Sequence, residues 1–431
     1  MSSKYSILRM SENGSRSEIG RHADYFQLNA GFKIGEAQVA ERRVKLGCER
    51  LMGSERELIA GKQVGIITNH SGVLPEGEHI VDVLRAGNDV SIKALFSPEH
   101  GIRGDAPAGK HLENEVDPKT GVQVYSLYGD HNKPDVTMLS GIDVLIYDIQ
   151  DVGVRFYTYI STLALVMEAA AENDIPLVLL DRPLVLPGHM IDGPVLNNEV
   201  RSFVGMLPIP VLYSLTPGEL AGLIRREYLA KKHLDLDLTV MKLENYSRSM
   251  WYDETGLNWL PPSPNIPAID TAAVYPGTAL IEGTNVSEGR GTESPFRLIG
   301  APFVDKMKLA DSLNSLELPG LKFNPVDFTP RGKSIVSHTR FKDELCHGIE
   351  LVVTRRDDLK PFEAGVAIVC ALRKLNPSEL VFRDDCAFDR LAGNKEVREL
   401  IERGADYLEI ASTWEHELEM FRSSMRRYFL Y

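Results

Sequence analysis

The feature that most constrains the fold is an alternation of short apolar runs with stretches of helical spacing. The runs are apolar on both faces, which is typical of strands in a parallel sheet that is covered on each side. They lie at residues 62–68, 90–96, 142–149, 175–181 and 236–243. Helical spacing is found at 79–87, 156–174 and 216–232, the last opening with Thr216 as N-cap and Glu219 at the third helical position. The sequence therefore predicts an α/β fold with a Rossmann-like, mostly parallel sheet.

A change of composition near Pro261 indicates a second domain. The segments "PPSPNIP" and "EGTNVSEGRGTESPF" are rich in Pro, Gly and polar residues and are too long to be simple connectors. Beyond Gly300 the pattern predicts a smaller α+β domain, with helices at 304–316 and 362–375 and a strand at 348–354. We expect an N-terminal extension over residues 1–44, a Rossmann-like domain over 45–298, and a smaller domain that completes the cleft over 299–431.

The charge of the chain indicates which partners it can bind, and its cysteine content indicates the cellular compartment. The chain has 61 acidic and 48 basic residues and a formal charge of -13. Binding a phosphate backbone needs a local excess of Lys and Arg, so we expect no nucleic-acid partner. The four cysteines are scattered without a CxxC pair, which fits a reducing compartment. Without an apolar run of about 18 residues or a recognisable signal peptide, we expect no membrane span and a cytoplasmic location.

Side chains capable of chemistry follow four of the predicted strands directly. Ligands of an open parallel sheet bind beyond the carboxyl ends of its strands, so these side chains are expected to share one rim. They are Asn69 and His70, Glu99 and His100, Asp148 and Asp151, and Asp181 and Arg182, with Arg155 and Tyr157 shortly after the third pair. Such loops are polar in most proteins, and Asp151 or Asp181 can equally cap a helix or form a turn.

Several common chemistries lack their sequence motifs. The first strand is followed by "NHSGV" in place of GxGxxG, and neither GxxxxGK[ST] nor GxSxG occurs. No HExxH or HxH is present, so we expect neither a cofactor nor a metal, although a metal-dependent hydrolase stays as an alternative. Carboxylates, aromatic rings and arginines suit glycoside hydrolysis, in which one carboxyl protonates the leaving oxygen and a second group acts at the anomeric centre.

Long motifs in collinear order carry a resemblance to a known family. They include "VGIITNHSGV", "ALFSPEHGIRGDAPAG", "IDVLIYDIQDVGVRFYTYISTL" and "YPGTALIEGTNVSEGRGTESPF", between about Leu46 and Tyr431. With these motifs the sequence resembles the exo-β-N-acetylmuramidase family, glycoside hydrolases long described as a domain of unknown function. The resemblance implies release of N-acetylmuramic acid (MurNAc) from the non-reducing end of peptidoglycan fragments such as MurNAc-β-1,4-GlcNAc. Family members are often exported, whereas this sequence suggests action on recycled cell-wall fragments in the bacterial cytoplasm.

The resemblance also implies roles for individual residues. Glu99, in the PEHG motif, is the first candidate for the proton donor, and its carboxyl must then stay protonated near neutral pH. Candidates for nucleophile, base or stabiliser are Tyr157, Asp148, Asp151 and Glu288. The 2-acetamido group of the substrate can itself attack instead, with a carboxylate such as Asp151 orienting the amide. For the lactyl carboxylate of MurNAc, a bidentate arginine is expected; the candidates are Arg155, Arg182 and Arg290.

We expect the remaining polar residues of the cleft to bind the sugar. The expected substrate-binding residues are Asn69, His70, His100, Arg155, Asp181, Arg182, Asn285, Glu288 and Arg290. The loop 285–292 lies where the first domain is expected to pass into the second, and a position in the cleft is therefore plausible for it. The alternative interpretation of this loop is a solvated Gly-rich linker. The alternative function on the same cleft is a non-catalytic protein that binds muropeptides or other sugars.

Overall fold

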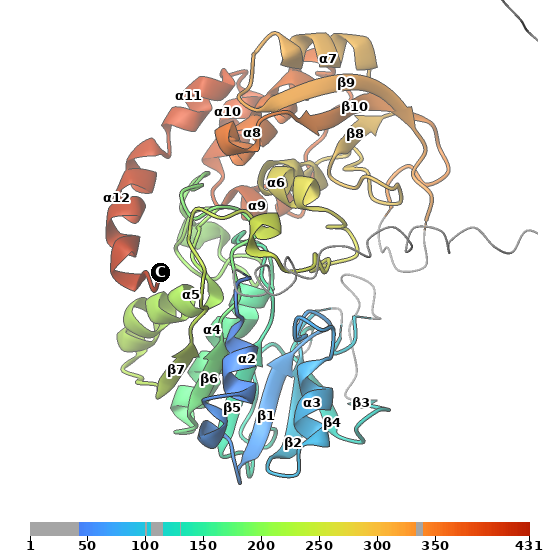
Figure 1. Ribbon diagram of the computed structural model, residues 1–431. Helices are drawn as coiled ribbons and strands as arrows, with labels where there is room; N and C mark the ends of the chain where they lie inside the picture. Colours follow the sequence, from blue (N-terminus) through green and yellow to red (C-terminus); the bar gives the residue numbers. More distant parts are fainter. Residues whose placement is uncertain (1–42, 100, 105–114, 130, 333–338) are drawn as a thin grey trace, which may run out of the picture. The chain divides into compact units, whose positions relative to one another are not determined.

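A seven-stranded, mostly parallel sheet forms the first half of the protein (Figure 1). The computed structural model describes residues 43–99, 101–104, 115–129, 131–332 and 339–431, and Arg43–Tyr431 form one compact unit. The strand order is β3-β4-β2-β1-β5-β6-β7. The strands are β1 (Gln63–Thr68), β2 (Ser91–Ser97), β3 (Glu115–Val116), β4 (Gln123–Ser126), β5 (Val144–Asp148), β6 (Leu177–Leu180) and β7 (Leu238–Met241). All neighbours are parallel except β3 on β4, which confirms the predicted class of fold.

Both faces of this sheet are covered, as the apolar character of the strands predicts. Alternate residues of β5 point to opposite faces. Leu145 and Tyr147 pack in the core that contains α4, whereas Val144 and Ile146 pack in the core that contains α2 and α3. The helices are α2 (Gly47–Met52), α3 (Ile80–Ala86), α4 (Tyr159–Glu172) and α5 (Pro217–Leu223).

The helix start predicted at Thr216 is present. The Thr216 hydroxyl accepts from the Glu219 N–H at 3.2 Å, and the Glu219 carboxylate accepts from the Thr216 N–H at 3.0 Å. These paired bonds satisfy N–H groups that have no partner within the helix. The α-helix is shorter than predicted, because it ends at Leu223 and passes into a π-helical turn at Ile224–Leu229.

A three-stranded antiparallel sheet, with the order β8-β10-β9, is the centre of the second half (Figure 1). Its strands are β8 (Leu298–Ala301), β9 (Leu321–Phe328) and β10 (Cys346–Val353). The helices are α6 (Ile269–Thr278), α7 (Lys306–Asn314), α8 (Pro361–Leu375), α9 (Ala387–Ala392), α10 (Glu396–Glu402), α11 (Tyr407–Ser412) and α12 (Glu415–Met425). The smaller α+β part is thereby confirmed. No helix within the described part of the chain is long and apolar enough to span a membrane.

Helices α6 and α8 cross at unusually close range. A Cβ atom at Gly277 of α6 would overlap the Pro361 carbonyl, and one at Gly365 of α8 would overlap the backbone of Gly277. Only glycine allows the two backbones to approach so closely. The crossing fixes the position of α6, which carries Tyr275 toward the first sheet.

Candidate active site

Three neighbouring strands deliver polar side chains to one edge of the large sheet. Asn69 follows the end of β1 directly, Glu99 lies two residues beyond β2, and Asp151 lies three residues beyond β5. Strands β2, β1 and β5 are adjacent and parallel, so their carboxyl ends meet at the same edge. This is the edge at which open α/β sheets bind ligands.

Glu99 is held by hydroxyl groups from two other elements. The Thr158 hydroxyl donates to Glu99 Oε2 at 3.0 Å. Thr158 precedes α4 in the N-cap position, but its side chain makes no capping bond to that helix. The Tyr128 hydroxyl also lies beside Glu99. Burial raises the pKa of Tyr128, and the charge of the Glu99 carboxylate and a hydrogen bond to it raise that pKa further. These contacts orient the Glu99 carboxyl group.

Asp151 is a buried carboxyl that uses only one of its oxygens. Its Oδ1 accepts from the Tyr213 hydroxyl at 2.7 Å and from the Gly153 N–H at 2.6 Å. Its Oδ2 has no hydrogen-bond partner among the described residues. Burial raises the pKa of Asp151 to about 6, although both hydrogen bonds act to lower it. One oxygen of this carboxyl therefore keeps unused capacity to accept a hydrogen bond.

Aromatic rings surround the two carboxyls. Tyr157 packs edge-on against Tyr159 at 4.8 Å and against Tyr275 at 6.2 Å between ring centroids. Burial raises the pKa of Tyr157 first, followed by the neighbouring tyrosines and the carboxylates of Asp151 and Glu99. The Tyr157 hydroxyl is buried and finds no partner in the described part of the chain. The structure thus brings Glu99, Asp151 and Tyr157 together.

The loop 285–292 adds an arginine and a third carboxyl. The Arg290 guanidinium lies 5.1 Å from the centre of the Phe296 ring, binds Glu282, and has Nη1 3.4 Å from Glu288 Oε1. Burial lowers the pKa of Arg290, while nearby Tyr275 and Glu99 act to raise it. Burial raises the pKa of Glu288 to about 7. Arg290 therefore places a positive charge within electrostatic range of Glu99.

Asn69 and His70 begin the loop after β1 but lie in different surroundings. Asn69 Oδ1 accepts from the Ser71 N–H at 2.9 Å and from the Ser71 hydroxyl at 2.6 Å, and its Nδ2 has no partner among the described residues. His70 Nε2 lies 2.8 Å from the Pro261 carbonyl oxygen. The His70 side chain lines a separate cavity of about 230 Å³, together with residues that include Arg182 and Trp259. His100 lies outside the described residues.

Asp148, Asp181 and Arg182 form buried networks at the strand ends. Arg182 binds both oxygens of Asp148, at 2.6 and 3.0 Å, and donates to the Val73 carbonyl at 3.0 Å. Asp181 accepts from the Thr216 hydroxyl at 2.8 Å and from the Tyr431 hydroxyl at 2.6 Å. The partners of all three side chains lie within the protein, so their observed contacts are structural.

Arg155 and Asn285 hold distant segments together. The buried Arg155 guanidinium donates to three carbonyls, those of Pro194 at 2.6 Å, Ile209 at 3.0 Å and Leu391 at 3.0 Å. The Asn285 amide donates to the Glu379 carbonyl at 2.8 Å and accepts from the Val381 N–H at 3.0 Å. The structure does not bring these two side chains to Glu99.

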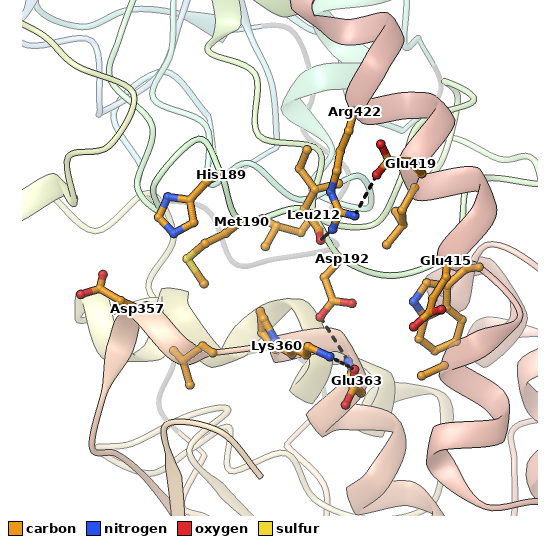
Figure 2. Close-up of a pocket in the computed structure, with 16 residues that line it drawn as sticks. His189, Met190, Asp192, Leu212, Asp357, Lys360, Glu363, Glu415, Glu419 and Arg422 are labelled. Carbon is orange, nitrogen blue, oxygen red and sulfur yellow. Dashed lines mark hydrogen bonds and ion pairs between the residues drawn. The ribbon is translucent and has the colours of Figure 1, made fainter.

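A larger cavity, of about 560 Å³, lies between residues 189–192, the start of α8 and helix α12 (Figure 2). Several of its charged groups have partners within the protein. Asp192 accepts the N–H groups at the start of α8, and Lys360 pairs with Glu363 at 3.0 Å. Arg422 lies 3.8 Å from Glu419. This cavity contains none of the expected site residues, and we place the active site at Glu99.

Three residues of the site were not anticipated from the sequence: Tyr128, Thr158 and Tyr275. Tyr128 follows β4, whose residues alternate between polar and apolar and form no continuous apolar run. Thr158 has the position of an ordinary helix cap. Tyr275 lies on a helix whose Pro276 obscures the helical pattern. These three residues lie within or beside the long family motifs, and this position in the sequence could have identified them as candidates for the site. Within the described ranges, no group of three or more His, Cys, Asp or Glu side chains is arranged to hold a metal ion.

Two carboxyls, a tyrosine cluster and an arginine at the carboxyl edge of a Rossmann-like sheet supply the groups that glycoside hydrolases, as a class, use. Models of the exo-β-N-acetylmuramidase NamZ family match residues 64–270 with their N-terminal part and residues 273–431 with their C-terminal part. The chain belongs to this family, which confirms the resemblance seen in its motifs.

Individual relatives agree with this membership. The chain is 44% identical over 389 residues to the peptidoglycan β-N-acetylmuramidase NamZ of Bacillus subtilis (strain 168), covering 90% of this chain and 92% of that protein. Two crystal structures of DUF1343 family proteins from Bacteroides fragilis NCTC 9343 match with TM-scores of 0.83 and 0.75 at 35% and 34% identity. Each match covers 90% of this chain and 99% of the other.

Proposed function

We propose that this protein is an exo-acting β-N-acetylmuramidase that hydrolyses MurNAc from the non-reducing end of peptidoglycan fragments, with MurNAc-β-1,4-GlcNAc as its simplest substrate. The observation that carries the proposal is the placement of two carboxyls, Glu99 and Asp151, at the same edge of the sheet near Tyr157, whose neighbour Thr158 bonds to Glu99. Family membership and the B. subtilis relative, a peptidoglycan β-N-acetylmuramidase by name, support the same activity.

Glu99 is the proposed proton donor. A glycosidic oxygen leaves readily only when a carboxyl group protonates it as the bond breaks. The Thr158 hydroxyl, 3.0 Å from Oε2, limits rotation of the Glu99 carboxyl. A donor fixed in this way is positioned for one oxygen of the bound substrate, which lowers the entropic cost of the proton transfer.

Asp151 is the proposed partner of the substrate's own nucleophile. Its Oδ2, which has no partner among the described residues, is suited to accept the N–H of the 2-acetamido group. The acetamido carbonyl oxygen then forms a bond to the anomeric carbon while the bond to the leaving oxygen breaks, and the proton of Glu99 passes to that oxygen. Water subsequently adds to the anomeric carbon, releases the acetamido oxygen, and returns a proton to Glu99.

Arg290 is the proposed ligand of the lactyl carboxylate. Of the three arginines expected to serve, it is the one on which the Glu99 carboxylate acts. Its Nε has no partner in the described ranges. Burial keeps the pKa of Glu288 near 7, so this neighbour is partly uncharged at neutral pH and offsets less of the arginine charge. An anionic sugar can therefore bind although the whole chain carries a charge of -13.

The test is the Glu99→Gln variant, assayed by chromatography for MurNAc released from MurNAc-GlcNAc. We expect the turnover to fall by about 10²- to 10⁴-fold, the usual contribution of a general acid. Thermal unfolding should be little changed, and Glu417→Gln on the exposed side of α12 serves as the matched control. Wild-type protein that releases no MurNAc from any muramide would refute the enzyme and leave a binding protein.

The cytoplasm is the proposed location. All four cysteines are free thiols, two of them buried, which fits a reducing compartment. The substrate would then be imported or recycled fragments of the cell wall. Fractionation of cells with an antibody against the protein tests this proposal, and a signal confined to the culture medium would refute it.

A further inference from the structure

Tyr275 stands at the junction of the two carboxyls and the arginine. Its ring packs edge-on against Tyr157 at 6.2 Å, on the side of the strand ends. It also packs edge-on against Phe296 at 4.7 Å, and the Arg290 guanidinium lies 5.1 Å from the centre of the Phe296 ring. The close crossing of α6 and α8 at Gly277, two residues further on, holds the ring in place. Tyr275 therefore bridges the carboxyl side and the arginine side of the site.

The Tyr275 side chain is 8% exposed, and no hydrogen bond joins its hydroxyl to another described residue; unlike the Tyr157 hydroxyl, it is not among the fully enclosed atoms that lack a partner. A hydroxyl that no protein group pairs and that the protein does not fully enclose can donate to a bound ligand. Burial raises the pKa of Tyr275, and the charges that act on it are those of Arg290, Glu99 and Asp151. At neutral pH the group is therefore an uncharged donor that can pair with an acceptor on a ligand.

The chemistry of the substrate indicates which acceptor this is. MurNAc differs from GlcNAc by a lactyl ether, whose carboxylate is the anionic group of the sugar. A carboxylate can accept hydrogen bonds from a guanidinium and from a phenol at the same time. We propose that the Tyr275 hydroxyl donates to the lactyl carboxylate next to Arg290, and that Tyr275 is a specificity-determining residue for muramic acid. This inference rests on the proposed function.

The experiment compares wild type and Tyr275→Phe on two chromogenic β-muramides, one with the free lactyl carboxylate and one with that carboxylate converted to a primary amide. On the free acid we expect kcat/KM to fall about 10- to 100-fold, the range for a hydrogen bond to a charged group. On the amide we expect a change of less than about 3-fold, because the charge that strengthens the bond is absent. Dissociation constants of MurNAc and its lactyl amide, measured by calorimetry, give the same comparison without turnover.

Tyr428→Phe is the matched control, because it removes a hydroxyl that donates to Glu227 at 2.7 Å and is no part of the proposed site. It should leave the ratio between acid and amide unchanged. Equal losses on both substrates would place Tyr275 in the chemistry common to both and overturn the inference, as would no loss on either. Failure of wild type to cleave any muramide would instead refute the proposed function, so the two failures are distinguishable. Thermal unfolding of each variant verifies that the fold is intact.

Discussion

Replacing Asp151 by asparagine should make the protein more stable and much less active. Asp151 Oδ1 accepts from Tyr213 and Gly153, and an asparagine oxygen can accept the same two bonds. Oδ2, which has no partner among the described residues, becomes an uncharged NH₂ group. The substitution thus removes a buried charge and keeps the hydrogen bonds that the charge accepts.

The size and the pH dependence of the gain follow from the pKa. Burial raises the pKa of Asp151 from 3.8 to about 6. A shift of about two units corresponds to roughly 3 kcal/mol of unfolding free energy. Because the folded-state pKa of this acid is raised, the unfolded chain loses its proton first, and stability falls as pH rises from about 4 to about 6. The advantage of Asp151→Asn should therefore be small near pH 4 and complete above pH 6, at up to roughly 3 kcal/mol.

The measurement is urea unfolding followed by tryptophan fluorescence at pH 4.5 and pH 7.5, with MurNAc release assayed in parallel. Asp192→Asn is the matched control. Burial also raises the pKa of Asp192 to about 6, but both of its oxygens accept backbone N–H groups, those of Gly193 and Phe362 at 2.8 Å and Glu363 at 3.3 Å. An asparagine NH₂ would face an N–H donor there, so this variant should lose stability. A gain at Asp151 that is independent of pH, or an equal gain at both positions, would refute the reasoning.

Two further outcomes test the structural and the chemical parts of this description. Arg182→Met leaves the buried Asp148 carboxylate without its ion pair, and we expect a loss of about 3–5 kcal/mol of unfolding free energy in urea titrations; a neutral effect would mean that the pair contributes little. Exhaustive dialysis against a chelator should leave MurNAc release unchanged, because the proposed chemistry uses protein side chains and the substrate's acetamido group. Activity that is lost and then restored by a divalent cation would contradict that chemistry.

The central strands are predictable because burial on both faces makes each of them a continuous apolar run. Strands β1, β2 and β5 all lie within about two residues of their predicted ranges. β9 was not predicted, because Pro325 lies within it. The structure accommodates this proline on an edge strand that pairs with β10 alone, where a missing N–H costs least. A sequence pattern identifies a strand well only when its neighbours cover it from both sides.

The site was less predictable than the fold, because a strand end shows where a side chain begins and not what it meets. Asp148 and Asp151 lie three residues apart at the end of the same strand. Asp148 pairs with Arg182 in the interior, whereas Asp151 bonds to Tyr213 and lies within electrostatic range of Tyr157. The difference depends on residues far away in the chain, as does the position of Tyr275. The sequence is sufficient to predict which edge of the sheet carries the site. The tertiary contacts are needed to distinguish the residues at that edge that hold the fold together from those that are candidates for catalysis.

The three carbonyl partners of Arg155 have a consequence for how the chain acquires its structure during synthesis. Leu391, which accepts one of these bonds, lies 236 residues after Arg155. At about 5–20 residues per second, the ribosome adds that segment roughly 10–50 s after Arg155 itself. Until then the guanidinium cannot make its hydrogen bond to the Leu391 carbonyl, one of the three that hold it in the interior. The surroundings of Arg155 therefore reach their final set of contacts only after the segment that contains Leu391, in α9, has been synthesised.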